Sequence, residues 1–400
     1  MPEVTLDSPA RRNPTLQPVI AGLVTALVGY TSSFAVVLTG LQAVGASPSQ
    51  AASGLLALTL TFAVVAIGLA WFTKRPITTA WSTPGAALLA GAGGMNFGWN
   101  EAVGAFLLTG VLIAATGAIP WLGRLVAAIP VHLAQAMLAG VLLQLCLAPF
   151  MALSTIPLYV TPVIVVWLLF LKLNPRWAVP VAMAVALGIA GFTLATSPGD
   201  SVHGVSLLPH LEFAIPAFTL RAFTGIALPL FVVTMASQNV PGVAVLKGFG
   251  YDVPWRSSML ATGIGTSVGA LFGGHAINLA AISAALAAGD EAGPDRSRRW
   301  IAAVSSGGFY IILGLASAAI TALAAASPAG LLEAAAGLAL LATLGSAASS
   351  ALAEPRTRLS ALITFLVAAS GLSIAGIGGA FWALVAGLTI GALLERGRRR

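Results

Sequence analysis

Charged side chains and cysteine are both scarce in this sequence. Only 8% of its 400 residues are Asp, Glu, Lys or Arg, whereas 58% are hydrophobic, and the mean hydropathy is +0.96. A soluble domain carries about a quarter charged residues, so this composition excludes that class and indicates a chain that crosses a membrane several times. The single cysteine, Cys146, lies in an apolar run and is interpreted as a small core residue, since it cannot form an internal disulfide.

Motifs of enzymes and metal proteins are missing as well. The sequence has no P-loop, no His/Cys cluster with metal-ligand spacing and no nucleophile motif. We therefore expect no enzyme activity, no metal and no cofactor other than a coupling proton. Residues 1–17 lack the apolar core and cleavage site of a signal peptide, so we expect nothing to be removed. The net charge of +7 comes from short basic clusters between apolar runs, which indicate membrane topology and not nucleic-acid binding.

The apolar sequence divides into about fourteen segments, each near the 20 or so residues that span a bilayer. These segments begin near residues 18, 49, 76, 100, 125, 157, 176, 222, 258, 274, 300, 329, 359 and 379. Lys and Arg fall almost entirely in the loops on one side, with Arg221 as the exception. Because cytoplasmic loops carry the basic residues, we expect both termini to face the cytoplasm.

A polar stretch between the seventh and eighth segments divides the chain into two halves. We predict a cytoplasmic tail (1–17), a first repeat of segments 1–7 (18–196), an external connecting loop (197–216), a second repeat of segments 8–14 (217–395) and a cytoplasmic basic tail (396–400). An odd number of spans in each half places the two halves in opposite orientations. The predicted fold class is an all-α polytopic membrane protein with two inverted repeats of seven.

The third and tenth segments begin with residues that disfavour a membrane helix. In the third, helix-favouring sequence starts only near Ser82, with Pro84 and Gly85 in the first turn. The tenth opens with FGGHAIN and favours a helix from about Leu279. A broken membrane helix is tolerated where its unpaired backbone groups line a cavity or meet protein. Two half-helices whose N-termini point at each other near the midplane would form a site for a small anion.

Polar residues from four segments are expected at this level of the membrane. The candidate substrate-binding residues are Tyr30, Thr31 and Ser32 in the first segment, Ser82, Thr83 and Gly85 in the third, Ser237, Gln238 and Asn239 in the eighth, and Gly274, His275 and Asn278 in the tenth. Ser and Thr in membrane helices commonly bond to their own backbone or pack helices, so that interpretation stays open for Thr31, Ser32 and Ser82. A buried histidine is also commonly structural.

Carboxylates, the usual proton carriers, are not expected at membrane depth. Glu101 and Glu333 lie near the outer ends of their segments. If transport is coupled to protons, His275 is the leading carrier, because the reference pKa of histidine is near 6.5. Direct protonation of the substrate is the competing route.

Three runs resemble the bacterial benzoate:proton symporter (BenE-type) family, and the resemblance extends over the whole chain. They are GYTSSFAVVL (29–38), SQNVPGVAVL (237–246) and FGGHAINLAAISAA (272–285). The resemblance implies an inner-membrane importer of benzoate or a related aromatic carboxylate, coupled to protons. More distantly it implies the seven-plus-seven inverted-repeat fold of nucleobase and sulfate-type transporters, in which a core domain moves like an elevator against a gate domain. It also places Gln238, Asn239, His275 and Asn278 in the core domain near the substrate.

Some features distinguish between substrates of that fold. Nucleobase carriers place acidic residues in the eighth and tenth segments, and this sequence has none there, which favours a carboxylate. Tyr30, Phe34, Trp81 and Phe231 are candidates for an apolar wall against an aromatic ring, with packing or lipid contact as the alternative. A nucleobase or inorganic-anion carrier or channel stays open, and a membrane enzyme or assembly factor is the third alternative. The expected partners are a small carboxylate anion, the lipid bilayer and a second copy in a homodimer.

Overall fold

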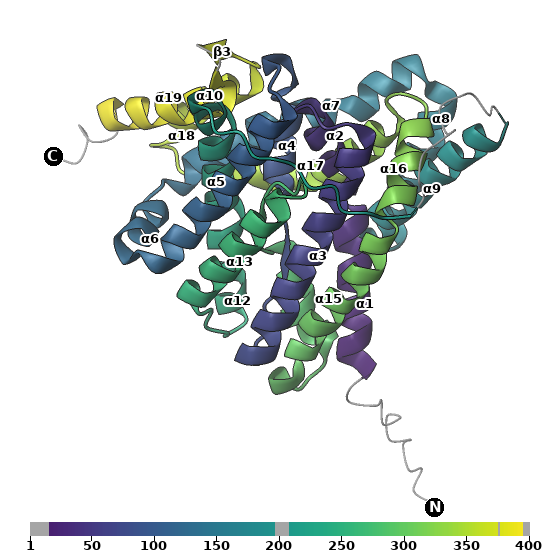
Figure 1. Ribbon diagram of the computed structural model, residues 1–400, viewed down its shortest axis with the longest axis horizontal. Helices are drawn as coiled ribbons and strands as arrows, with labels where there is room; N and C mark the ends of the chain where they lie inside the picture. The colour runs from purple at the N-terminus through teal and green to yellow at the C-terminus, as the bar shows by residue number, and fades with distance from the viewer. Residues whose placement is uncertain (1–15, 197–207, 375–376, 395–400) are drawn as a thin grey trace, which may run out of the picture.

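The computed structural model describes residues 16–196, 208–374 and 377–394. The predicted tails (1–17 and 396–400) and the first part of the predicted connecting loop (197–216) fall largely outside this part of the chain. Helices dominate the described residues, and the few strands are two or three residues long (Figure 1). The predicted all-α polytopic class is confirmed.

Residues 16–196 form nine α-helices, one strand and one 3₁₀ turn. These elements are α1 (Leu16–Thr31), α2 (Phe34–Ala43), α3 (Pro48–Thr73), β1 (Thr79–Trp81), α4 (Thr83–Ala90), η1 (Gly93–Met95), α5 (Trp99–Ala118), α6 (Pro120–Ala127), α7 (Val131–Thr155), α8 (Pro157–Leu173) and α9 (Pro175–Thr196). Local sequence explains several of the starts. Ser47 and Gln50 form a capping box at the start of α3, and proline occupies the first turn of α3, α6 and α8.

The second half contains the other described elements. They are α10 (Leu220–Ala222), η3 (Phe223–Ala227), α11 (Leu228–Thr234), η4 (Met235–Asn239), α12 (Val240–Gly248), α13 (Trp255–Ala270), β2 (Ile277–Leu279), α14 (Ile282–Ala288), η5 (Asp290–Ala292), η6 (Arg296–Arg298), α15 (Trp300–Leu315), α16 (Ser317–Ala326), α17 (Leu331–Leu352), α18 (Arg358–Ala369), β3 (Ser373–Ile374), β4 (Ile377–Gly378) and α19 (Gly379–Leu394). Residues 220–248 form one continuous helical stretch in which η3 and η4 are π-helical turns.

Several helices are long and apolar enough to cross a membrane. Within the described residues there are seven, or eight if the bent pair 296–315 and 317–326, with a 52° angle, counts as one span. Helices α3, α8, α9 and α19 begin within one residue of their predicted starts. The helix predicted to start near residue 125 begins at Val131 instead, because Ile119 and Pro130 separate the short helix α6 from its neighbours. The number fourteen stays a prediction.

The helices pack in two groups. In one group α3 packs against α15, and α5 packs against α13. Helices α3 and α5 are the second and fourth segments of the first half, and α13 and α15 are the second and fourth of the second half. Each pair therefore joins the second segment of one half to the fourth of the other, as expected for an inverted repeat. In the second group α7 packs against α17 and α18, while α8 packs against α9. The crossing of β1 and β2 lies within the first group.

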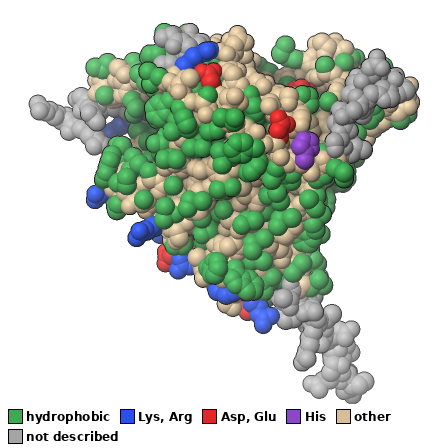
Figure 2. Space-filling view, in the orientation of Figure 1, with side chains coloured by type: hydrophobic (Ala, Val, Ile, Leu, Met, Phe, Trp, Pro, Cys, Tyr) green, Lys and Arg blue, Asp and Glu red, His purple; other side chains and the backbone are tan. Residues whose placement is uncertain are grey.

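Most basic side chains on the face shown in Figure 2 lie along one edge. In Figure 2 most of the visible Lys and Arg side chains follow the lower left edge, and hydrophobic side chains cover the face above it. Arg221, the exception in the sequence, donates to the Met95 carbonyl, and its guanidinium lies 4.7 Å from the centre of the Phe97 ring. These contacts account for an arginine on the less basic side.

Candidate functional site

Two short strands from opposite halves of the chain pair with each other. Strands β1 and β2 are antiparallel, with Thr79 opposite Leu279, Ala80 opposite Asn278 and Trp81 opposite Ile277. The pairing is extended by a bond from the Ser82 N–H to the Ala276 carbonyl, 2.8 Å long. It satisfies backbone groups that would otherwise be unpaired in the apolar interior. Helix α14 therefore begins at Ile282, three residues later than the sequence indicated, because Leu279 belongs to the strand.

Ser82 connects the third segment to the eighth. Its Oγ accepts from the Gly85 N–H at 3.1 Å and so caps helix α4, as the sequence predicted for a start near this residue. The same oxygen lies 2.8 Å from Oγ1 of Thr234 in α11. A Cβ on Gly85 would lie 2.4 Å from Cδ1 of Leu230, so the glycine permits α4 to pack closely on α11.

Asn239, at the end of the π-helical turn η4, contacts β2 directly. The side chain is fully buried, and its Oδ1 accepts from the Leu279 N–H at 2.8 Å. Its Nδ2 lies 3.1 Å from Sδ of Met235. The next helix also approaches β2 closely, because a Cβ on Gly242 would meet the Ala280 carbonyl oxygen at 3.0 Å. The side-chain amide of Asn239 thus links the eighth segment to the tenth.

His275 and Asn278 are fully buried beside the crossing. Nδ1 of His275 accepts from the Ala276 N–H at 2.6 Å, and its ring lies edge-on to Phe106 with centroids 6.3 Å apart. Nδ2 of Asn278 donates to the Leu279 carbonyl at 2.8 Å. Four buried polar atoms of the candidate residues have no hydrogen-bond partner within the described part of the chain: Tyr30 Oη, Ser237 Oγ, His275 Nε2 and Asn278 Oδ1.

The first segment contributes aromatic rings. Tyr30 lies 5.8 Å from Phe34 and 5.2 Å from Trp81 between ring centroids, and Phe62 meets Trp81 edge-on at 5.5 Å. Phe231, the fourth ring predicted for the wall, is buried on α11. An aromatic cluster therefore lies beside β1 and next to the unpartnered hydroxyl of Tyr30.

The other candidates are distributed as follows. The hydroxyls of Thr31 and Ser32 bond to the carbonyls of Leu27 and Gly29 in their own helix, so both adopt the arrangement of the structural alternative. Thr83 donates to Ser33 Oγ at 3.1 Å, and that oxygen also accepts from the Trp81 indole at 2.8 Å. Gln238 is half-buried. Gly274 is packed against Leu58, with 3.1 Å between its ideal Cβ and that side chain.

Several polar residues beside the crossing were not among the predicted site residues, and Thr234 and Thr266 are two of them. Thr234 shares a hydrogen bond with Ser82, and Thr266 Oγ1 accepts from the Ile277 N–H at 3.0 Å. Thr234 lies five residues before Asn239, a spacing that would have pointed to the site only if the π-helical turn had been known. Thr266 is one of two threonines and three serines in helix α13, so its residue type alone does not single it out.

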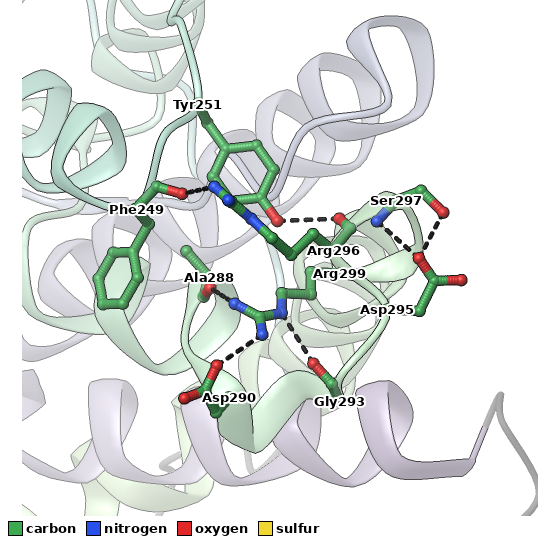
Figure 3. A network of polar contacts seen from close by, with 9 residues as sticks. All are labelled: Phe249, Tyr251, Ala288, Asp290, Gly293, Asp295, Arg296, Ser297 and Arg299. Atoms are coloured by element: carbon green, nitrogen blue, oxygen red, sulfur yellow. Dashed lines mark hydrogen bonds and ion pairs between the residues drawn. The ribbon is translucent and has the colours of Figure 1, made fainter.

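Among the described residues, Arg299 is the one charged residue whose side chain is buried. It lies at the C-terminal end of helix α14. Figure 3 shows its guanidinium donating to the Ala288 carbonyl at 2.5 Å, the Gly293 carbonyl at 2.8 Å and the Asp290 carboxylate at 2.7 Å. Ala288 is the last residue of α14, so a cation there satisfies a helix carbonyl and is favoured by the helix dipole. Arg296 extends the network to Phe249.

We predict that Arg299→Ala lowers the free energy of unfolding by about 2 kcal/mol, because two buried carbonyls lose a charged donor. The exposed carboxylate of Asp290 adds little to this effect. Thermal melting of the purified protein in detergent measures the change. Arg298→Ala is the matched control, since Arg298 is exposed and its ion pair with Asp295 is 3.6 Å long. Equal melting temperatures for the two variants would contradict the prediction.

Comparison with known proteins decides the family. The sequence model of the family described as "Benzoate membrane transport protein" matches residues 13–393. The chain belongs to this family. It is 41% identical over 377 residues to the "Inner membrane protein YdcO" of Escherichia coli K12, with 94% of each chain covered. It is 31% identical over 384 residues to the "Benzoate membrane transport protein" of Acinetobacter baylyi, with 96% of each covered. As a member of this family the chain is a membrane transporter and not an enzyme.

Solved structures place this family member among known folds. The anion-transporter family structure SLC26A9 matches with a TM-score of 0.64 at 13% identity, over 96% of this chain and 66% of that one. The transmembrane domain of the cyanobacterial bicarbonate transporter BicA matches with a TM-score of 0.57 at 16% identity, over 94% and 97%. At these identities the likeness concerns the fold, and it confirms the predicted inverted-repeat fold class.

Proposed function

We propose that this transporter imports benzoate or a related aromatic carboxylate together with protons across the bacterial inner membrane. The observation that carries the proposal is the set of four buried, unpartnered polar atoms on Tyr30, Ser237, His275 and Asn278. Burying a polar atom without a partner costs free energy, so such atoms point to a ligand that completes their bonds. The name of the Acinetobacter baylyi relative supports benzoate as the substrate class.

The chemistry around these atoms suits an aromatic carboxylate. The hydroxyls of Tyr30 and Ser237 can donate to carboxylate oxygens, and the capped first turn of α4 adds a favourable dipole. The rings of Phe34, Trp81 and Tyr30 provide an apolar face for the aromatic part. No Asp or Glu is buried within the described residues, so no fixed carboxylate there repels an anion. Because α14 has only seven residues, the second side of the site is assigned to the side chains of β2 and η4.

Proton coupling would offset the electrical cost of moving an anion into the cell. A monoanion that enters a cell works against an inside-negative potential of about 2.3 kcal/mol per charge per 100 mV, and a co-transported proton cancels that cost. His275 is the proposed carrier, because it is a buried titratable group beside the crossing. Elevator-like movement of the first helix group against the second, cytoplasmic termini and a homodimer belong to the same proposal. The basic edge in Figure 2 supports this orientation.

Radiolabelled benzoate uptake into proteoliposomes tests the proposal. With an imposed inward proton gradient, we expect accumulation that a protonophore abolishes and that other aromatic acids compete. Competition by uracil, sulfate or bicarbonate, with none by aromatic acids, would assign the site to a nucleobase or inorganic anion. Folded protein that binds benzoate but accumulates it equally without a gradient would overturn the proton coupling alone.

We predict that Ser82→Ala raises the KM for benzoate about fivefold. The substitution removes the cap of α4, which is worth about 1 kcal/mol, and the bond to Thr234. Initial uptake rates over a range of benzoate concentrations measure the effect. Thr61→Ala is the control, since its hydroxyl bonds only to carbonyls of its own helix. A KM unchanged in Ser82→Ala would remove the capped turn from the site.

A further inference from the structure

A pocket lies between α5, α6, α12 and α13, and none of its lining residues belongs to β1 or β2. Its volume is about 570 Å³. The pocket lies where α5 ends and α13 begins, and basic residues occur there in the sequence. Its walls are mainly apolar and include Thr116, Val240, Val243 and Trp255, together with two arginines, Arg124 and Arg256.

The two arginines are not neutralised by acidic side chains. Arg124 lies in the last turn of α6 and Arg256 in the first turn of α13, and both side chains are exposed. Neither forms an ion pair with any acid that the structure describes, whereas Arg176, Arg298 and Arg299 do. Lys247 follows Val243 by one helical turn, so it is on the same side of α12 as the pocket wall. The lining of the pocket therefore carries two positive charges that no described acid neutralises.

Exposed apolar side chains lie next to the pocket along α6. Ile119, Trp121 and Leu125 are exposed on α6 and at its start. Trp255 lines the pocket, and its indole donates to the Thr116 carbonyl at 3.2 Å. Tryptophan and arginine beside exposed apolar residues are typical of the level where lipid head groups meet acyl chains.

The size of the pocket indicates an occupant larger than a single-ring acid. A cavity of about 150 Å³ already holds benzene, and this pocket is several times larger. We propose that it binds the head group of an anionic phospholipid. The phosphate lies between Arg124 and Arg256, and the acyl chains lie along Trp121 and Leu125. Basic pockets between membrane helices on the cytoplasmic side bind such head groups by charge complementarity.

A lipid at this place touches two parts of the transporter at once. Helix α6 joins α5 to α7, and it packs against the π-helical turn η4. Val240 in the pocket wall directly follows Asn239. The bound lipid thus holds the linker helix against the eighth segment. This role is independent of the transported substrate.

Native mass spectrometry of the purified protein, titrated with phosphatidylglycerol in a nonionic detergent, tests the site. We expect Arg124→Gln and Arg256→Gln each to weaken binding about fivefold, and the double variant about 25-fold, because each basic residue near a lipid surface contributes a similar amount. The double lysine variant, Arg124→Lys with Arg256→Lys, keeps both charges and is expected to retain most of the affinity. Arg356→Gln is the matched control, an exposed arginine outside the pocket that should bind normally.

Competition separates the lipid from other ligands. We expect phosphatidylcholine to bind at least tenfold more weakly, and neither glycerol 3-phosphate nor benzoate to displace phosphatidylglycerol. Equal affinity in the wild type and the double glutamine variant would overturn the proposal. Displacement by glycerol 3-phosphate would identify a site for soluble phosphates, and displacement by benzoate would identify a second carboxylate site. Either result would also overturn it.

Discussion

Replacing Asn239 by alanine is expected to lower kcat/KM for benzoate uptake 10- to 100-fold. The wild-type side chain accepts a hydrogen bond from the Leu279 N–H, which lies in β2 and is buried. Alanine leaves that donor unpaired, at a cost of about 1–3 kcal/mol. The strand then loses its fixed position relative to the eighth segment. Concentration-dependent uptake into proteoliposomes measures the loss.

Two further variants define what the amide contributes. Asn239→Asp keeps an acceptor for the Leu279 N–H but adds a buried carboxylate, so we expect uptake at least as low as in Asn239→Ala because the charge repels the anion. Asn174→Ala, an exposed asparagine at the end of α8, should transport normally. Wild-type kinetics in Asn239→Ala, at equal protein abundance, would show that this amide has no part in transport.

His275→Ala is expected to abolish gradient-driven accumulation of benzoate while leaving exchange of external for internal benzoate. Nδ1 of His275 accepts from the Ala276 N–H, so a neutral ring carries its proton on Nε2. A second proton must go to Nδ1 and break that bond. The Ala276 carbonyl in turn accepts from Ser82 at the start of α4. In the proposed mechanism, protonation of His275 would therefore be linked to the backbone of both crossing strands, and we expect removal of the ring to uncouple benzoate movement from proton movement.

The measurement compares net uptake under a proton gradient with counterflow, in which labelled benzoate enters vesicles preloaded with unlabelled benzoate. His210→Ala is the matched control, because His210 lies in an exposed segment and contacts Ser49. We expect it to retain both activities. Intact accumulation in His275→Ala would show that the substrate itself carries the proton. Loss of counterflow as well would show that His275 is a structural or binding residue.

Much of the helix arrangement follows from local sequence. The length of apolar runs predicted where α3, α8, α9 and α19 begin, and proline in the first turn of α3 and α8 agrees with those starts. The poor helix formers before Ser82 and around His275 likewise indicated where the third and tenth segments are not helical. These signals are local, because caps and helix propensity act within one turn.

The connections within the site could not be predicted in the same way. The pairing of β1 with β2, and the bonds from Ser82 to Thr234 and from Asn239 to Leu279, join residues that are far apart in the sequence. A strand of three residues has no periodicity that a single sequence reveals. Ser32, whose hydroxyl bonds to the Gly29 carbonyl three residues before it, has the same residue type as Ser82. Only packing distinguishes them.

The π-helical turns of the eighth segment have a consequence for insertions and deletions. Each such turn holds one residue more than an α-helical turn, so deleting one residue within it restores regular α-helix. The following helix would then rotate by about 100° and shift by about 1.5 Å. A deletion within η4 would turn Gly242 away from the Ala280 carbonyl, although every side chain after it keeps its identity. The number of residues in this helix therefore specifies the site as strictly as the residue types do.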